Sequence, residues 1–204
     1  MRIIEVKNNK LSQPDLKKAI LILKKGGIII YPTETAYAIG GDALNKKVIK
    51  KIFSLKSRSQ KKPLPVIAGS FKQAKKIAVF DQSSTVLAKK YWPGPLTLIL
   101  KRKKIAPAIL TAGKEKIAVR VAGLKIAREI SIRLNRPLVS TSANVSGKKE
   151  CYTVKAILKQ SSRLTEKVDI ILDAGKLPKV KPSTIAEVKN GKIKVLREGP
   201  IVLS

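Results

Sequence analysis

The chain has 204 residues, 44% of them hydrophobic, and this length predicts a single domain over residues 1–204 that buries one sizeable core. It contains one cysteine, Cys151, and no histidine. An internal disulfide, a zinc site built from His and Cys, and a histidine general base are therefore excluded. The longest apolar runs are about five residues, far short of the roughly 20 that a membrane-spanning helix needs. Without a secretory signal pattern, the sequence predicts a cytoplasmic protein with no membrane partner.

The charge is strongly unbalanced, because 44 Lys and Arg stand against 13 Asp and Glu and give a formal net charge of +31. A field of this strength attracts polyanions, so tRNA or double-stranded RNA is a predicted partner. Many of the lysines repeat on one predicted helix, at Lys46, Lys47, Lys50 and Lys51. Biased codon usage would produce the same repetition, and that explanation stays open beside RNA binding.

Short β-rich runs alternate with helical patterns along the chain, which predicts mixed α/β layers. The first strand is predicted over residues 2–6. Ser12 then caps a helix with apolar residues at helical spacing, and Gly26-Gly27 ends it before a strand over 28–31. The next predicted elements are a helix, a strand and two further helices: 45–55, 64–68, 70–78 and 82–91.

The second half of the chain continues this alternation. Trp92-Pro93-Gly94-Pro95 predicts a rigid turn. The elements expected after it are strands over 96–100 and 117–121, a helix over 124–134, a strand over 137–140, a helix over 153–159 and a strand over 168–172. Asn190-Gly191 is a strong hairpin signal between strands over 184–188 and 192–196. Segment 175–182 contains apolar residues, and we interpret it as an ordered surface loop rather than a linker.

A cluster of cations follows the predicted helix over 45–55. It contains Lys56, Arg58, Lys61 and Lys62. Arginine presents a planar fork to phosphate oxygens and lysine a movable point charge, so the loop suits a ligand that carries phosphates. Such a run is also typical of a solvated face, and composition alone favours that interpretation.

Polar residues directly follow two of the predicted strands. Segment 140–147, Ser-Thr-Ser-Ala-Asn-Val-Ser-Gly, lies at the carboxyl end of an apolar strand, where open α/β sheets bind ligands. A polar turn is the alternative. Segment 31–37 ends its strand in the same way, and Gly40-Gly41-Asp42 then predicts a turn. Arg120 lies inside an apolar strand and needs a partner, because burying an unpaired cation is expensive.

These pieces, in this order, resemble the YrdC-type threonylcarbamoyl-AMP synthases of the YrdC/YciO family over nearly the whole chain. The family's Lys-x-Arg and distant Ser-x-Asn appear as Lys56-Ser57-Arg58 and Ser142-Ala143-Asn144. A Tyr-Pro-Thr-Glu opening at 31–34 and a Trp-Pro-Gly-Pro-Leu-Thr turn at 92–97 accompany them. The resemblance implies the short, single-domain form, with a twisted, open, mixed α/β sheet around a concave, positively charged cavity.

The resemblance also implies an activity. The chain would make threonylcarbamoyl-AMP and pyrophosphate from L-threonine, bicarbonate or CO2, and ATP, as an L-threonylcarbamoyladenylate synthase. This nucleotidyltransferase step leads to the N6-threonylcarbamoyladenosine of tRNA position 37, through downstream threonylcarbamoyl-transferase proteins. ATP is expected as a substrate with Mg²⁺, without an organic cofactor and without metal ligands from the protein.

Residue roles follow from the motif positions. The resemblance makes Lys56 and Arg58 catalytic. The residues implied to bind ATP are Lys56, Arg58, Lys62, Ser142, Asn144, Tyr152 and Arg197. Those implied to bind threonine are Thr33, Thr35, Arg120, Ser140, Ser183 and Thr184.

Two departures and one alternative accompany this interpretation. Longer relatives carry a histidine where this chain has Ile67, and they append a second domain. The alternative is a YciO-like protein that binds double-stranded RNA or acts in RNA maturation without synthase activity. The net charge favours it, whereas an aromatic content of 4% argues against a protein that stacks single-stranded bases.

Overall fold

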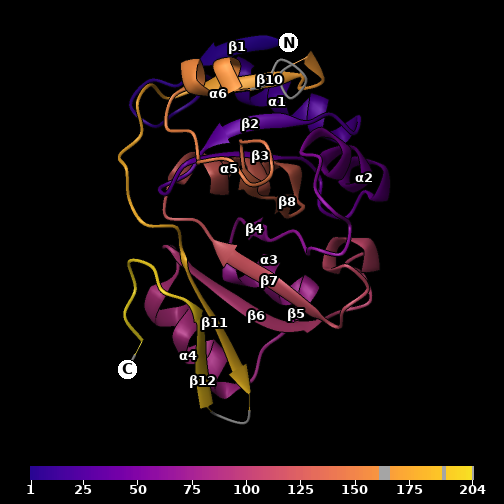
Figure 1. The fold of residues 1–204 in the computed structure, drawn as a ribbon, viewed down its shortest axis with the longest axis vertical. Coiled ribbons are helices and arrows are strands. Elements are labelled where there is room, and N and C mark those ends of the chain that lie inside the picture. Colours follow the sequence, from indigo (N-terminus) through magenta and orange to yellow (C-terminus); the bar gives the residue numbers. More distant parts are fainter. Residues whose placement is uncertain (161–165, 190–191, 204) are drawn as a thin grey trace.

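Two mixed β-sheets follow one another along the long axis of the molecule (Figure 1). This computed structural model describes residues 1–160, 166–189 and 192–203. Within these ranges, no helix is both long and apolar enough to cross a bilayer. The predicted α/β class is confirmed.

The first sheet contains β1 (Arg2–Glu5), β2 (Ile29–Pro32), β3 (Tyr37–Gly40), β9 (Thr141–Ser142) and β10 (Ile170–Asp173). Its strand order is β1-β10-β2-β3-β9. β10 lies between β1 and β2 and runs parallel to both, while β3 is antiparallel to β2 and to β9. The sheet thus combines strands from both ends of the chain.

The second sheet contains β4 (Val66–Ala68), β5 (Ala78–Val79), β6 (Leu96–Arg102), β7 (Lys116–Val121), β8 (Leu138–Val139), β11 (Thr184–Lys189) and β12 (Lys192–Arg197). The main order is β12-β11-β6-β7-β4-β8, and β5 pairs with β6. β11 is parallel to β6, and β7 is parallel to β4. The predicted hairpin is confirmed by the antiparallel pairing of β11 with β12, although its turn residues 190–191 lie outside the described ranges.

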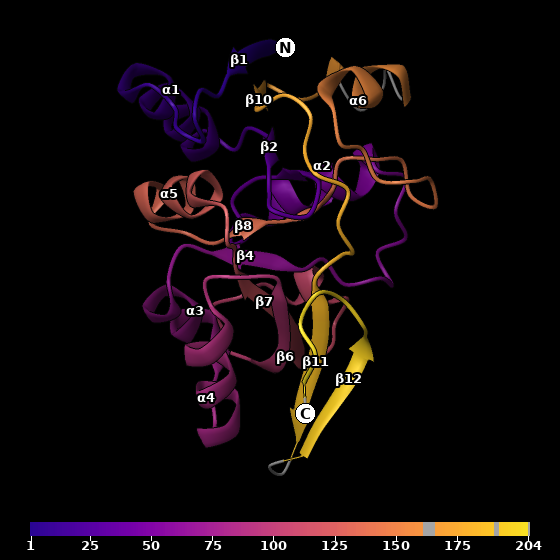
Figure 2. The ribbon, with the colours of Figure 1, turned by 90° about the vertical axis from the view of Figure 1, so that its left-hand side faces the viewer.

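The helices are α1 (Gln13–Lys24), α2 (Lys46–Leu55), α3 (Phe71–Ile77), α4 (Gln82–Tyr91), α5 (Lys125–Leu134) and α6 (Val154–Gln160), with a short 3-10 helix η1 (Ala108–Thr111). The predicted cap of α1 is confirmed, because the Ser12 side chain accepts a hydrogen bond from the Asp15 N–H. Four helices, α1, α5, α3 and α4, lie along one side of the molecule (Figure 2). α5 contacts both β2 and β4, and it therefore joins the two sheets.

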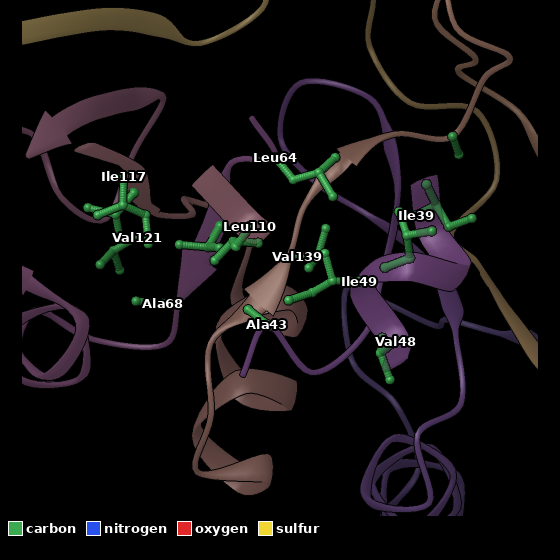
Figure 3. Packing of buried hydrophobic residues seen from close by; sticks show 14 of the residues in the cluster. Ile39, Ala43, Val48, Ile49, Leu64, Ala68, Leu110, Ile117, Val121 and Val139 are labelled. Carbon is green, nitrogen blue, oxygen red and sulfur yellow. The ribbon is translucent and has the colours of Figure 1, made fainter. Parts of the chain in front are cut away.

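A buried apolar cluster extends between the sheets (Figure 3). Ile39 of β3, Ile49 of α2 and Val139 of β8 are fully buried in it, and so are Leu110 and Ile117 around the second sheet. Each such side chain contributes about 1.5 to 3 kcal/mol relative to an exposed one. Burial in this cluster fixes the strand ends of one sheet relative to the other.

Several boundaries differ from those predicted. The turn expected at Gly40-Gly41 is wrong at Gly40, which ends the unpredicted strand β3. A Cβ on Gly40 would lie 1.9 Å from the Val139 carbonyl oxygen, so this glycine permits a close approach of two strands rather than a turn. The strand expected over 137–140 is shorter: β8 ends at Val139, and the chain crosses to the other sheet as β9. The short elements β5 and η1 were not predicted either.

Candidate active site

A cavity of about 340 Å³ lies where the β2–β3 loop, the loop after α2 and the ends of both sheets meet. Most of the predicted site residues line it, although they come from distant segments of the chain: Thr33, Thr35, Arg58, Arg120, Ser140, Ser142, Ser183 and Arg197. Lys56, Lys62, Asn144, Tyr152 and Thr184 are not among the lining residues. The crossing from β8 to β9, where the chain changes sheets, places Ser140 and Ser142 in the cavity lining.

The β2–β3 loop forms a tight turn organised by Thr33. The Thr33 hydroxyl donates to the Ala36 carbonyl at 2.7 Å and accepts weaker hydrogen bonds from the N–H groups of Thr35 and Ala36, both at 3.3 Å. The Thr35 hydroxyl lies 3.0 Å from that of Thr33. Thr33 is thus occupied by its own turn, whereas Thr35 is less buried and presents its hydroxyl to the cavity.

Arg120, on β7, has the partner that its burial requires. Its Nη1 lies 2.7 Å from the Glu34 Oε1, and the two side chains are only 9% and 20% exposed. The Glu34 Oε2 also accepts a long hydrogen bond of 3.4 Å from the Leu124 N–H at the start of α5. The expectation of a partner for Arg120 is confirmed, although the sequence did not identify Glu34.

The loop after α2 places Arg58 in the cavity wall and leaves Lys61 and Lys62 in solvent. The Arg58 Nη2 donates to the Pro63 carbonyl at 2.9 Å, and its Nε donates to the Lys62 carbonyl at 3.3 Å. Burial lowers the pKa of Arg58 below its usual value. Lys61 and Lys62 are exposed. The interpretation of the loop as a solvated face therefore holds for these two lysines but not for Arg58.

Lys56 is buried behind the same wall, only 1% exposed. Its Nζ donates to the carbonyls of Ser142 and Asn144 and to the Asn144 side-chain oxygen, the last two at 2.7 and 3.0 Å. Burial and the nearby Arg58 guanidinium lower the pKa of Lys56 to about 7. An ammonium has three N–H donors for these acceptors and a neutral amine has two, so the contacts oppose loss of the proton. Lys56 thus ties the Ser-x-Asn segment to the end of α2.

The Ser-x-Asn segment is also ordered internally. The Ser142 hydroxyl donates to the Asn144 Oδ1 at 2.7 Å, and the Asn144 amide nitrogen donates to the Lys148 carbonyl at 2.5 Å. Asn144 is buried, and its side chain both accepts and donates hydrogen bonds here, so it shapes the wall that Ser142 presents to the cavity. The Tyr152 hydroxyl donates to the Glu150 carboxylate at 3.3 Å, and Glu150 rather than Tyr152 lines the cavity.

The far wall is built by the C-terminal hairpin. The Arg197 guanidinium donates to the Ser183 carbonyl from Nε and Nη2, at 3.0 and 2.7 Å, and Nη2 also reaches the Ser183 hydroxyl at 3.1 Å. That hydroxyl lies 2.9 Å from the hydroxyl of Thr97. Burial lowers the pKa of Arg197. Thr184 is fully buried, and its hydroxyl donates to the Ile201 carbonyl at 2.8 Å, so it anchors the C-terminal segment.

Several acidic or hydroxyl residues at the site were not among the predicted site residues, including Thr97, Glu150 and Glu34. Thr97 and Glu150 line the cavity, and Glu34 contacts Arg120. Thr97 faces the same side of the sheet as Arg120 by strand alternation, a signal that was available once both strands had been placed. Glu150 follows the Ser-x-Asn segment in a Lys-rich loop and gave no comparable signal.

Gly199 allows the C-terminal segment to cross the Ser183 backbone. An added Cβ would lie 2.4 Å from both the Pro182 oxygen and the Thr184 nitrogen. We expect Gly199→Ala to lower the free energy of unfolding by about 1 to 3 kcal/mol, because backbone rather than a mobile side chain must move. Val202→Ala, at a position 85% exposed in the same segment, is the control. Equal urea midpoints for the two variants would contradict this account of the crossing.

The sequence matches one family model over most of its length. The model Sua5_yciO_yrdC, described as telomere recombination, matches residues 21–199. The chain belongs to this family. The resemblance that the Lys-x-Arg and Ser-x-Asn motifs indicated is therefore confirmed.

Two relatives match most of their own length. A Methanocaldococcus jannaschii protein, named provisionally as a threonylcarbamoyl-AMP synthase, is 38% identical over 200 residues, which cover 96% of this chain and 93% of the relative. The threonylcarbamoyl-AMP synthase of Psychromonas ingrahamii is 34% identical over 185 residues, covering 89% of this chain and 96% of the relative.

Two solved structures share the fold closely. Pyrococcus abyssi Sua5 in complex with L-threonine has a TM-score of 0.91 at 30% identity, over 98% of this chain and 58% of that one. E. coli YciO has a TM-score of 0.84 at 28% identity, over 98% of this chain and 95% of that one. The chain thus spans little more than half of the P. abyssi protein and nearly all of the E. coli one.

Proposed function

We propose that this chain is an L-threonylcarbamoyladenylate synthase, which converts L-threonine, bicarbonate or CO2, and ATP into threonylcarbamoyl-AMP and pyrophosphate. The observation that carries the proposal is the cavity. It collects Arg58 and Arg197, suited to phosphates, with Thr35 and Arg120, suited to a small amino acid, around one cavity. The names of the relatives and the threonine in the P. abyssi complex support the same activity.

The reaction needs no protein nucleophile, which suits a chain without histidine. The neutral amine of threonine attacks CO2, forms a nitrogen–carbon bond and releases a proton to solvent, giving a carbamate. A carbamate oxygen then attacks the α-phosphorus of ATP, and the bond to the bridging oxygen of pyrophosphate breaks. Catalysis rests on holding the two substrates in line and on stabilising charge as pyrophosphate leaves.

The roles of the site residues come from the family resemblance, and the positions of these residues in the cavity wall are compatible with them. Arg58 and Arg197 would contact the triphosphate, and Ser142 would contact the nucleotide from the β9 side. Thr35, Arg120 and Ser183 would contact threonine, with Ser140 completing that wall. Lys56, Asn144, Thr33 and Thr184 are engaged in internal hydrogen bonds and would act by holding the walls in place. Lys62 and Tyr152 remain predicted contacts to ATP.

Mg²⁺ is proposed as part of the ATP substrate. Within the described residues, no group of three His, Cys, Asp or Glu side chains could hold a metal ion. We propose that the triphosphate oxygens carry the ion, because Mg²⁺ prefers oxygen ligands and commonly binds substrate phosphates. When bound, it would neutralise phosphate charge. The ion and the two arginines would then share the neutralisation of the triphosphate charge. The main role of Arg58 and Arg197 would be to orient the triphosphate.

Serine should be a poorer substrate than threonine. It lacks the methyl group, and a missing methyl in an apolar pocket costs about 1 to 3 kcal/mol, or roughly 10- to 200-fold in kcat/KM. The cavity offers apolar contacts from Ile67 and Ala118 beside Arg120. Pyrophosphate release measured with each amino acid gives the ratio. Equal kcat/KM values would contradict the threonine pocket without contradicting the class of enzyme.

The activity itself is tested with purified protein, ATP, bicarbonate and labelled threonine. We expect pyrophosphate release that requires both threonine and bicarbonate, together with a labelled adenylate. Pyrophosphate release that is independent of threonine, or no release with intact ATP binding, would refute the proposal.

Contact with tRNA, and transfer of the product by further threonylcarbamoyl-transferase proteins, are also proposals. The YciO-like alternative explains the net charge but leaves a cavity lined by Arg58, Arg120 and Arg197 without a ligand. RNA binding without synthase activity is therefore the less favoured function.

A further inference from the structure

The three arginines of the cavity differ in how their charge is balanced. Arg120 forms an ion pair with Glu34. Arg58 and Arg197 donate to backbone carbonyls instead, and within the described residues neither forms an ion pair. Glu34 thus offsets the charge of Arg120 within a direct ion pair, whereas Glu150, which also lines the cavity, acts on Arg197 without forming one.

We propose that Glu34 is a positioning and specificity-determining residue that reserves the Arg120 end of the cavity for a zwitterionic amino acid. This inference rests on the proposed function. Free threonine has no net charge, whereas ATP and pyrophosphate carry several negative charges. A paired arginine can orient one carboxylate, while an unpaired one also attracts phosphate oxygens, which match its fork equally well.

The geometry supports a positioning role. Both carboxylate oxygens of Glu34 have donors, Arg120 on one side and the Leu124 N–H on the other. Leu124 is the N-cap of α5, and no side chain of its own caps that helix. Glu34 therefore fixes the guanidinium relative to both β7 and α5. One Nη1 hydrogen is engaged, and the remaining donors of the fork stay available for a ligand.

Glu34→Gln tests the inference, since it removes the charge and keeps the shape and a hydrogen-bond acceptor. Calorimetric titrations with L-threonine and with inorganic pyrophosphate need no turnover. We expect the variant to bind threonine at least about tenfold more weakly than the wild type. We also expect pyrophosphate to compete with threonine in the variant but not in the wild type. In steady state, KM for threonine should rise while KM for ATP stays within about twofold.

Two further variants make the result specific. Glu187→Gln removes a carboxylate that pairs with Lys116, outside the cavity lining, and should leave both titrations unchanged. Glu34→Gln combined with Arg120→Gln removes both charges, so any gain in pyrophosphate affinity that Glu34→Gln causes should be lost again in the double variant. This second arm remains informative if the single variant is less stable.

The possible outcomes distinguish a failure of the proposed role of Glu34 from a failure of the proposed synthase activity. Wild-type affinity of Glu34→Gln for threonine, or pyrophosphate competition identical to that of the wild type, would overturn the role of Glu34 and leave the synthase intact. Equal losses of threonine and ATP affinity with a lowered melting temperature would also overturn it, in favour of a purely structural role. A wild-type protein that binds ATP but no threonine would overturn the proposed function, and the inference with it.

Discussion

Replacing Arg58 by alanine should lower kcat/KM for threonine-dependent pyrophosphate release by at least about 100-fold, or ~2.7 kcal/mol of transition-state stabilisation. Two loop carbonyls hold Nε and Nη2 and orient the rest of the fork toward the cavity. Arg58→Lys keeps the charge and loses this fixed fork. We therefore expect a loss of at least roughly tenfold, about 1.4 kcal/mol, even for the milder change.

The matched control is Lys47→Ala, which removes a neighbouring cation from the exposed face of α2. Pyrophosphate assays and melting temperatures are measured for all three variants. Arg58→Lys with the kcat/KM and melting temperature of Lys47→Ala would mean that the loop is only a solvated basic run, and the catalytic assignment would fail.

Lys56→Met should have the largest effect on stability, lowering the free energy of unfolding by about 2 to 4 kcal/mol. Methionine is unbranched and flexible like lysine, although its side chain is one atom shorter and ends before the position of Nζ. It cannot donate, so the carbonyls of Ser142 and Asn144 lose a buried partner. Because Ser142 lines the cavity, kcat/KM should fall as well.

Urea unfolding of Lys56→Met is compared with that of Lys51→Met, which alters an exposed lysine on the same helix and should change stability by less than about 0.5 kcal/mol. If the two variants unfold at the same midpoint, Lys56 does not tie the Ser-x-Asn segment to α2. Its place in the site would then be that of a direct contact to ATP.

The helices were predictable because their signals are local. Ser12 and the apolar spacing behind it defined α1, and the paired lysines of α2 face solvent as the pattern indicated. The strand β3 was missed because Gly40 is typical of a turn in sequence. Gly40 instead lets the backbone of β8 approach more closely than any side chain would permit. This role depends on Val139, which lies about 100 residues further along the chain.

At the site, too, local sequence signals were predictive and contacts between distant residues were not. Arg58 and Ser142 belong to the short Lys-x-Arg and Ser-x-Asn patterns, and the resemblance supplied Arg197 and the roles of all three residues. The cost of burying a cation predicted that Arg120 has a partner. It could not name Glu34, which is 86 residues distant along the chain and meets Arg120 only after β2, β7 and α5 have packed.

The place of β10 between β1 and β2 has a consequence for the order in which the protein can fold as it is made. β2 can form a hairpin with β3 early, but its other edge and all of β1 wait for residues 170–173. At about 5 to 20 residues per second, a ribosome needs on the order of ten seconds to make the intervening chain. Throughout that time the nascent chain carries an open, isoleucine-rich strand edge, which is the kind of surface that chaperones bind and that pairs wrongly with other chains.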